Sequence, residues 1–342
     1  MISARKYVMY VVVLLGVLAF IMIAAWKQYT QFISTPKSSV ATRISVERGD
    51  GLRHIVEKLQ ASGMNTGPLW LWQLLAYQTD ALGRIKAGEY ALSPAISPHM
   101  LLDHMRLGRV IQYKFTIVDG WNIHQLRAAL DRAPALRHTI DTMADDALMR
   151  ALGAEKIDSL EGRFLPETYL YQRDATDLSI LKRAYETMSK VLAKVWQSRA
   201  PDLPLTNPEQ ALILASIIEK ETALPSERAQ ISGVFIRRLE RNMKLQTDPT
   251  VMYGMGSRYQ GTLHKQDLTT DTPYNTYTRL GLPPTPIAMP GYPSLVAAVH
   301  PAAGDALYFV ASGNSQGGHV FSATLEEHNR AVAHYLQQIQ QK

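Results

Sequence analysis

The sequence of 342 residues contains no cysteine. This absence excludes disulfide bonds, thiolate metal sites and a cysteine nucleophile. It is compatible with an oxidising compartment such as the periplasm, but it does not identify one. Any chemistry carried by this chain must therefore use other side chains.

Several common functional motifs are also missing. The ten histidines form no H-E-x-x-H or comparable ligand spacing, so we predict no metal site. No G-x-S-x-G elbow and no phosphate-binding glycine loop occurs, which argues against an α/β-hydrolase and against nucleotide chemistry. We therefore predict neither a metal nor a cofactor.

Clusters of basic residues are absent, although the net charge is +6. Nucleic-acid-binding domains usually concentrate lysine and arginine on a patch or interleave them with aromatic residues. Here the basic residues are spread along the chain, so we predict no nucleic-acid partner. The positive charge instead suits a lipid surface or an acidic polymer.

One long uncharged run, Tyr7–Trp26, follows Arg5 and Lys6. Its twenty residues are enough to cross the hydrocarbon core of a bilayer. The two preceding basic residues favour a cytoplasmic N-terminus, although Lys27 on the far side weakens the bias. The run is longer than the core of a cleaved signal peptide, and Ile23 disrupts the small-residue cleavage pattern. We therefore predict a cytoplasmic tail at 1–6, a single uncleaved membrane helix at 7–26, and a polar linker at 27–42.

The remaining chain is predicted to be α+β, with two domains. Between 43 and 116 the pattern alternates as β-α-α-β-α-β, which is typical of a small α+β module. Between 117 and 342 we predict a larger α+β domain. It contains a long amphipathic helix at 178–195, a loop-rich region with short strands at 243–293, a strand pair at 307–311 and 318–321, and a closing helix at 325–340.

The most informative stretch runs from Thr206 to Ala223. Asn207 can cap a helix with Pro208 in the first turn, or Thr206 and Glu209 can form a capping box. The apolar residues that follow point in nearly every direction, which is typical of a buried helix. We therefore predict a helix in the core of the larger domain.

The last turn of this helix carries two carboxylates, Glu219 and Glu221. They lie about 200° apart on the helix, so they cannot share one environment. Glu221 has Ile217, Ile218 and Leu214 behind it, and both this apolar setting and the helix C-terminus disfavour ionisation. A glutamic acid that stays protonated near neutral pH can protonate a glycosidic oxygen. The alternatives are that Glu221 pairs with a basic residue such as Arg228, or that it frays into water.

Two irregular segments further on, Gln246–Thr250 and Tyr274–Tyr277, combine amides, hydroxyls and aromatic rings. This composition suits a sugar-binding cleft, but it is equally typical of ordinary turns. A resemblance to a known family also begins at these residues. Five segments together resemble the YceG family of endolytic murein transglycosylases: Leu214–Thr222, Leu245–Val251, Tyr274–Tyr277, Gly281–Pro284 and Gly318–Phe321.

The resemblance covers nearly the whole chain and implies specific roles. Residues 43–116 are similar to a LysM-like module, and 117–342 to the catalytic domain. Glu221 matches the catalytic glutamate of the family, and the expected substrate-binding residues are Gln246, Asp248, Asn275 and Tyr277. Glu219 is interpreted as a structural residue with an arginine partner, and Arg163 and Glu167 as weaker supporting candidates.

The reaction implied by the resemblance is cleavage of the MurNAc–GlcNAc β-1,4 bond inside nascent peptidoglycan strands. It leaves a 1,6-anhydroMurNAc end and terminates elongation of the glycan. The implied location is the inner membrane, with the catalytic domain in the periplasm and peptidoglycan synthases as possible partners. Two alternatives stay open at this point: a hydrolytic muramidase with Asp248 as base, and a peptidoglycan-binding scaffold without activity.

Overall fold

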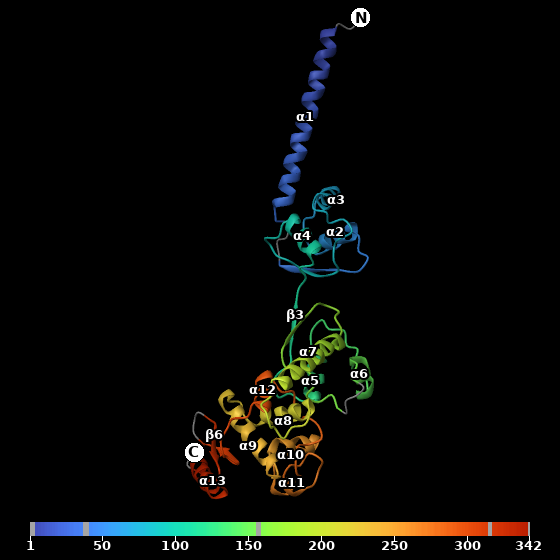
Figure 1. Ribbon diagram of the computed structural model, residues 1–342. Coiled ribbons are helices and arrows are strands. Elements are labelled where there is room, and N and C mark those ends of the chain that lie inside the picture. The colour runs from blue at the N-terminus through green and yellow to red at the C-terminus, as the bar shows by residue number, and fades with distance from the viewer. Residues whose placement is uncertain (1–3, 37–40, 155–158, 314–316, 341–342) are drawn as a thin grey trace. The chain divides into compact units, whose positions relative to one another are not determined.

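The computed structural model (Figure 1) confirms a mixed α+β chain with one long N-terminal helix. It describes residues 4–36, 41–154, 159–313 and 317–340. Residues 1–3 of the predicted tail and 37–40 of the predicted linker lie outside the described residues. Two compact units are present: residues 1–113 with Gln172–Asp174, and Lys114–Tyr171 with Ala175–Lys342. The predicted limits of the LysM-like module and the catalytic domain stay predictions, because compactness alone does not define a domain.

The first helix, α1 (Ala4–Ser34), is longer than predicted. It contains the apolar run, and Lys6–Ser34 is long and apolar enough to cross a membrane. The polar linker predicted from residue 27 is helical as far as Ser34. Lysine and glutamine are good helix formers in this stretch, and Tyr29 and Phe32 are buried in the core of the first unit. Packing of these two rings therefore extends the helix beyond its apolar run.

The first unit is built from short helices on a two-stranded sheet. Its elements after α1 are β1 (Thr42–Val46), α2 (Leu52–Ala61), α3 (Leu69–Gln78), β2 (Gly88–Leu92) and α4 (Pro98–Leu107). Strands β1 and β2 are antiparallel, with Thr42 opposite Leu92 and Val46 opposite Gly88. Alternate residues of β1, Ile44 and Val46, face the core, as the period of a strand requires.

The third strand of the predicted module does not join this sheet. The last strand of the pattern predicted within 43–116 corresponds to β3 (Tyr113–Thr116), which pairs with β4 (Thr168–Tyr171). Ile111 still donates to the Glu89 carbonyl at 2.7 Å, whereas Ile117 donates to the Glu167 carbonyl at 3.0 Å. The strand pattern was therefore real, but a sequence pattern does not say which partner a strand will find.

The second unit has a helical core around α8 (Pro208–Glu221), which packs against α7, α9, α10 and α12. Its elements are α5 (Ile123–Leu130), α6 (Asp145–Leu152), α7 (Asp177–Gln197), η1 (Pro225–Glu227), α9 (Arg228–Glu240), α10 (Asp248–Met255), η2 (Gly256–Arg258), α11 (Lys265–Thr269), α12 (Tyr292–Val299), β5 (Tyr308–Ala311), β6 (His319–Ser322) and α13 (Leu325–Gln340). All eight residues from Ala211 to Ile218 are buried, which confirms the prediction of a helix that is apolar on every side.

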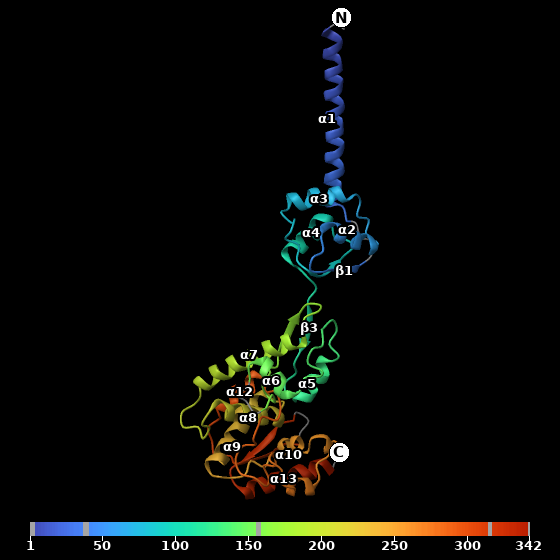
Figure 2. The same cartoon turned by 90° about the vertical axis from the view of Figure 1, so that its right-hand side faces the viewer.

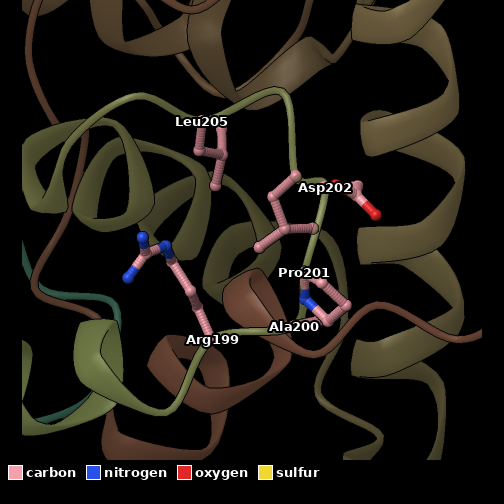
Figure 3. A pocket seen from close by; sticks show the side chains of 6 residues that line it. Arg199, Ala200, Pro201, Asp202 and Leu205 are labelled. Carbon is pink, nitrogen blue, oxygen red and sulfur yellow. The ribbon is translucent and has the colours of Figure 1, made fainter.

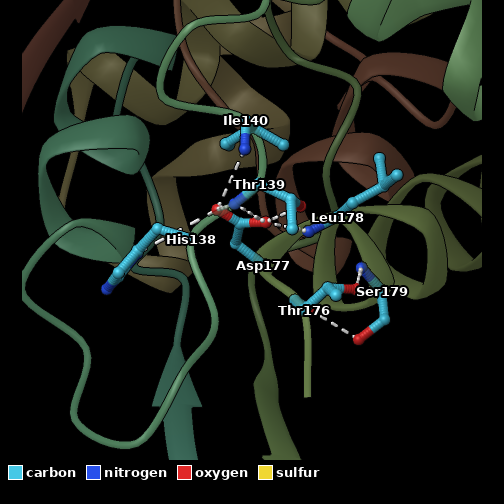
Figure 4. A network of polar contacts seen from close by, with 7 residues as sticks. All are labelled: His138, Thr139, Ile140, Thr176, Asp177, Leu178 and Ser179. Atoms are coloured by element: carbon cyan, nitrogen blue, oxygen red, sulfur yellow. Dashed lines mark hydrogen bonds and ion pairs between the residues drawn. The ribbon is translucent and has the colours of Figure 1, made fainter. Parts of the chain in front are cut away.

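A buried carboxylate fixes the start of α7 (Figure 4). The Thr176 hydroxyl accepts from the Ser179 amide at 3.1 Å and caps the helix. Asp177 accepts from the amides of Thr139 at 2.8 Å and Ile140 at 3.2 Å. These amides satisfy a carboxylate that has no access to solvent. Asp177 therefore ties the segment before α6 to the first turn of α7.

The loop-rich region at 243–293 is long, as predicted, but the prediction of short strands within it was wrong. In its part of the described chain the elements are short helices, including α10 and α11, where we predicted short strands. Proline at the second position of α10, Pro249, favours a helix start because its φ is already helical. The C-terminal strand pair is confirmed: β5 and β6 are antiparallel, with Tyr308 opposite Ser322.

Candidate active site

Glu221 is the last residue of α8. The helix begins at an Asn207 cap, whose side chain accepts from the Gln210 amide at 3.0 Å, with Pro208 in the first turn. This outcome confirms the first of the two predicted caps. Thr222 has extended backbone angles, so the chain leaves the helix directly after Glu221. The helix is buried from Ala211 to Ile218 and holds this carboxyl group at its end.

Thr247 holds Glu221 in place from the loop before α10. Its hydroxyl donates to Glu221 Oε1. The Thr247 amide in turn donates to Thr276 Oγ1 at 3.0 Å, and Thr250 and Thr276 share a hydrogen bond of 2.9 Å. All three threonines are buried. The position of the Glu221 carboxyl is therefore set by a network of hydroxyls that has little freedom to relax.

The environment of Glu221 favours the protonated acid. Burial raises its pKa to about 7, and the negative charge of Asp248 acts in the same direction. The Thr247 hydrogen bond and the charges of His319 and Arg238 lower the pKa and offset part of this effect. The side chain is nevertheless partly exposed, so the group can exchange a proton with a molecule in solution. An accessible acid with a pKa near neutrality can act both as proton donor and as proton acceptor.

Glu219 lies on the other side of the same helical turn. Its Oε2 accepts from the Gly291 amide at 3.0 Å, and its Oε1 lies 3.6 Å from Nη2 of Arg228. Both side chains of this ion pair are largely buried, with 6% and 12% exposed. Arg228 therefore pairs with Glu219 and not with Glu221. The structural role of Glu219 stays a prediction.

Two predicted substrate-binding residues lie beside each other near the end of α8. The Tyr277 hydroxyl donates to Asp248 Oδ1 at 2.5 Å. Burial, the Asp248 hydrogen bond and nearby negative charge raise the pKa of Tyr277, so the phenol stays a donor. Because the charges of Asp248 and Glu221 influence each other, these groups form one polar cluster with Glu221.

Gln246 borders the same cluster with an exposed side chain. Its φ of +49° is unusual for a residue other than glycine and carries a conformational cost. The Gln246 amide donates to the Thr276 carbonyl at 3.2 Å, and Arg238 Nη1 lies 3.5 Å from Gln246 Oε1. These contacts hold the strained turn that brings Thr247 to Glu221.

Asn275 differs from the other predicted cleft residues because it is completely buried. Its Nδ2 contacts the carbonyl oxygens of Asp267, Leu268 and Thr270 at 3.1, 3.2 and 2.7 Å. Its Oδ1 accepts from the Tyr277 amide at 2.8 Å. The Nδ2 hydrogens are directed at the loop, and none points to solvent. Asn275 therefore positions Tyr277 and the loop, and the arrangement gives no support to a direct sugar contact.

The two weaker candidates lie elsewhere. Arg163 Nη2 pairs with Glu209 Oε2 at 2.6 Å, and Glu209 belongs to the first turn of α8. The fourteen residues of α8 span about 21 Å, because each residue adds 1.5 Å. Glu167 is exposed, and its carbonyl accepts from Ile117 beside the β3–β4 pair. The structure does not bring either residue to Glu221.

The model of the YceG-like family matches residues 44–334. This chain belongs to the YceG-like family. The match includes the buried helix, the threonine network and the polar cluster around Glu221. It therefore covers every residue that surrounds the candidate acid.

Several individual proteins are similar to this YceG-like chain. A protein of Bacillus subtilis (strain 168) named endolytic murein transglycosylase is 32% identical over 267 residues, which is 73% of each protein. A protein of the same name from Streptococcus pneumoniae is 26% identical over 86% of this chain, and the match spans 58% of that longer relative. A crystal structure of a YceG-like protein from Listeria monocytogenes has a TM-score of 0.53 at 28% identity, and the match covers 86% of this chain and 99% of that one.

A pair of residues near Glu221 was missed by the sequence analysis of this YceG-like chain. Glu227 accepts from the His319 amide at 2.7 Å, and its Oε2 lies 2.8 Å from His319 Nδ1. The Thr222 hydroxyl also donates to Glu227 at 3.2 Å. Gly318, with φ +92°, is required here because a Cβ would lie 2.8 Å from Glu227 Oε1. The Gly318–Phe321 segment was the only sign in the sequence that His319 belongs to the site. No local pattern could pair His319 with Glu227, which is 92 positions away.

A second buried glutamate was also missed. Glu161 is 1% exposed, and burial raises its pKa to about 7. It accepts from the Ile123 amide at 3.2 Å and from the Tyr253 hydroxyl at 3.1 Å. Since Glu161 has no access to solvent, it ties α5 to α10 and cannot touch a substrate directly.

Two other surface features lie apart from Glu221. A pocket of about 380 Å³ is lined by residues of the loop between α7 and α8, among them Arg199, Asp202 and Leu205 (Figure 3). It adjoins the N-terminal end of α8, whereas Glu221 is at the other end. Ligand atoms of Asp131, His138 and Asp141 lie within 4.8 Å of one another, but all three residues are exposed. Nothing further in the described residues indicates a metal there.

Proposed function

We propose that this chain is an endolytic murein transglycosylase that cuts the β-1,4 bond between MurNAc and GlcNAc inside peptidoglycan strands. The observation that carries the proposal is Glu221, a partly exposed acid with a pKa of about 7 at the end of a buried helix. Membership of the YceG-like family and the names of the relatives from Bacillus and Streptococcus support it.

The proposed reaction needs one carboxyl group in two protonation states. Glu221 first donates its proton to the bridging oxygen as the bond between that oxygen and the muramyl C1 breaks. The resulting carboxylate then takes the proton from the muramyl 6-hydroxyl, whose oxygen closes on C1. No water is consumed, the proton returns to Glu221, and the product ends in 1,6-anhydroMurNAc. A pKa near neutrality suits both steps.

The neighbouring groups have separate tasks in this proposal. Thr247 orients the carboxyl and helps it to accept the negative charge after the first step, because it donates a hydrogen bond to Oε1. Asp248 and Tyr277 are exposed to different degrees and offer an acceptor and a ring for the sugars. Gln246 offers its exposed side-chain amide to the sugars beside the same polar cluster.

Membrane anchoring is part of the proposal. The apolar helix over Lys6–Ser34 supports a single-pass anchor, and the basic residues before it favour a cytoplasmic N-terminus. The second unit would then act in the periplasm, at the inner membrane, where new glycan strands emerge. An anchored enzyme would meet such strands before they are assembled into the mature wall.

The test compares wild type with Glu221→Gln on polymerised, uncrosslinked glycan. Products are separated and weighed by mass spectrometry. Wild type is expected to give anhydroMurNAc ends, which are lighter than reducing ends by one water. Glu221→Gln is expected to give no products, with unchanged glycan binding and circular dichroism.

Other outcomes distinguish the alternatives. Reducing MurNAc ends from the wild type would identify a hydrolytic muramidase, in which Asp248 is the obvious base. Glycan binding by the wild type without any cleavage would identify a scaffold. Cleavage by Glu221→Gln at the wild-type rate would remove Glu221 from the catalytic role.

A further inference from the structure

Helix α3 in the first unit has one apolar face that no part of the described chain covers. Trp70, Leu74 and Tyr77 are 47%, 37% and 76% exposed. They lie within about 60° of one another around the helix, at the i, i+4, i+7 spacing of a single stripe. The opposite face, with Leu71, Trp72, Leu75 and Ala76, is buried in the core of the unit. No residue of α3 is charged.

Two contacts with α1 determine the direction of this exposed face. Tyr29 donates from its hydroxyl to Gln78, at the border of the exposed face. One turn further along α1, Phe32 packs edge-to-face on Trp72, on the buried face, with ring centroids 5.4 Å apart. The earlier residue of α1, Tyr29, thus contacts the exposed side of α3, and the later residue, Phe32, contacts its buried side. The stripe therefore faces back along α1, toward Trp26.

The depth of the stripe follows from the helical rise. Tyr29 is three residues after Trp26, which corresponds to about 4.5 Å along the axis. The headgroup layer on each side of a bilayer is roughly 5–8 Å thick. Figure 2 shows α3 running across the end of α1. In a bilayer crossed by α1, a helix in this position would lie in the plane of the surface, at headgroup depth.

We propose that α3 is an interfacial helix that lies on the outer surface of the bilayer through Trp70, Leu74 and Tyr77. The inference rests on the membrane anchor of the proposed function and adds a second lipid contact to it. Tryptophan and tyrosine are the residues that prefer this layer, because one end of each ring is apolar and the other is polar. Between residues 27 and 113 there are ten lysines and arginines but six acidic residues, which suits an anionic lipid surface.

The absence of cysteine allows a direct test. Single cysteines are introduced into the full chain at Leu74, Tyr77, Trp26 and Ser45, and each is labelled with an environment-sensitive fluorophore. The proteins are reconstituted into nanodiscs of phosphatidylcholine and phosphatidylglycerol that contain shallow nitroxide-labelled lipid. Ser45 is the control, because it is exposed on β1. Strand β1 lies at the end of the unit away from α1 (Figure 2).

Labels at Leu74 and Tyr77 are expected to lose intensity and shift to the blue, as at Trp26, while the label at Ser45 does neither. Quenching at Trp26 without quenching at Leu74 and Tyr77 would overturn this inference alone and leave the anchor intact. A label at Trp26 that is not quenched would overturn both. Since the nitroxide is carried by the lipid, quenching at the stripe reports contact with lipid and not with a protein partner.

Discussion

Replacing Glu221 with glutamine is expected to stabilise the second unit at alkaline pH. The pKa of Glu221 is raised by burial from 4.5 to about 7, so the folded state favours the protonated acid. A folded pKa above the unfolded pKa gives stability that is complete below pH 4.5 and is lost as the pH rises through 7. Glutamine does not titrate, and it can still accept from Thr247.

The size of this effect follows from the shift. The difference between a pKa of 4.5 and one of about 7 corresponds to an upper limit of roughly 3 kcal/mol, at 1.36 kcal/mol per pKa unit. Because the side chain is partly exposed and water screens its charge, we expect about 1–2 kcal/mol. Relative to wild type, Glu221→Gln should gain this amount between pH 5 and pH 8.

The measurement is urea unfolding of the full chain at pH 5 and pH 8, with the folded fraction of the second unit read by pulse proteolysis. Glu186→Gln, an exposed glutamate on α7, serves as the matched control and should show no gain. If the stability difference between Glu221→Gln and wild type is the same at both pH values, the raised pKa is refuted, whatever the enzyme does to glycan.

Two further predictions concern the neighbours of the acid. Thr247→Val removes the hydroxyl that lowers the pKa of Glu221. Because a hydrogen bond to a charged group is worth about 1.5–3 kcal/mol, the alkaline limb of the pH–rate profile should move up by roughly 1–2 pH units. Thr187→Val loses a hydroxyl on α7 that bonds the Arg183 carbonyl and has no contact with Glu221, so it should leave the limb in place. Equal profiles for the two variants would contradict this role of Thr247. Arg228→Met leaves Glu219 unpaired in a largely buried site and should lower the free energy of unfolding by roughly 3 kcal/mol. The control Arg279→Met breaks an exposed pair with Asp271 and should lower it by less than about 1 kcal/mol. Similar thermal midpoints for both variants would show that Glu219 does not depend on Arg228.

Local patterns in the sequence predicted the elements that pack independently of distant partners. The apolar residues of α8 point in all directions, and the structure buries them on all sides. The same periodicity separated Glu219 from Glu221, and the two residues do have different partners. The strand pair at the C-terminus was equally clear, because both strands are short apolar runs a few residues apart.

Features that depend on distant contacts were not predictable. The extension of α1 to Ser34 depends on Tyr29 and Phe32 finding a core that later residues build. The hydrogen bond from Thr247 to Glu221 joins residues 26 positions apart. The sequence analysis listed its neighbours Gln246 and Asp248 as site residues, but it did not list Thr247. The resemblance to the family led us to expect Asn275 to bind sugar, whereas its burial follows from the fold of the loop around it.

The two carboxylates at the end of α8 also respond to selection in opposite ways. Glu219 satisfies Arg228 and the Gly291 amide, so folding alone is enough to retain it. Glu221 makes the folded state less stable at neutral pH and above, and only a need to move protons retains it. In a mutational scan, abundance should fall at position 219 and rise at position 221, while activity falls at both. A lineage that no longer needed the reaction would therefore be expected to lose Glu221 first and to keep Glu219.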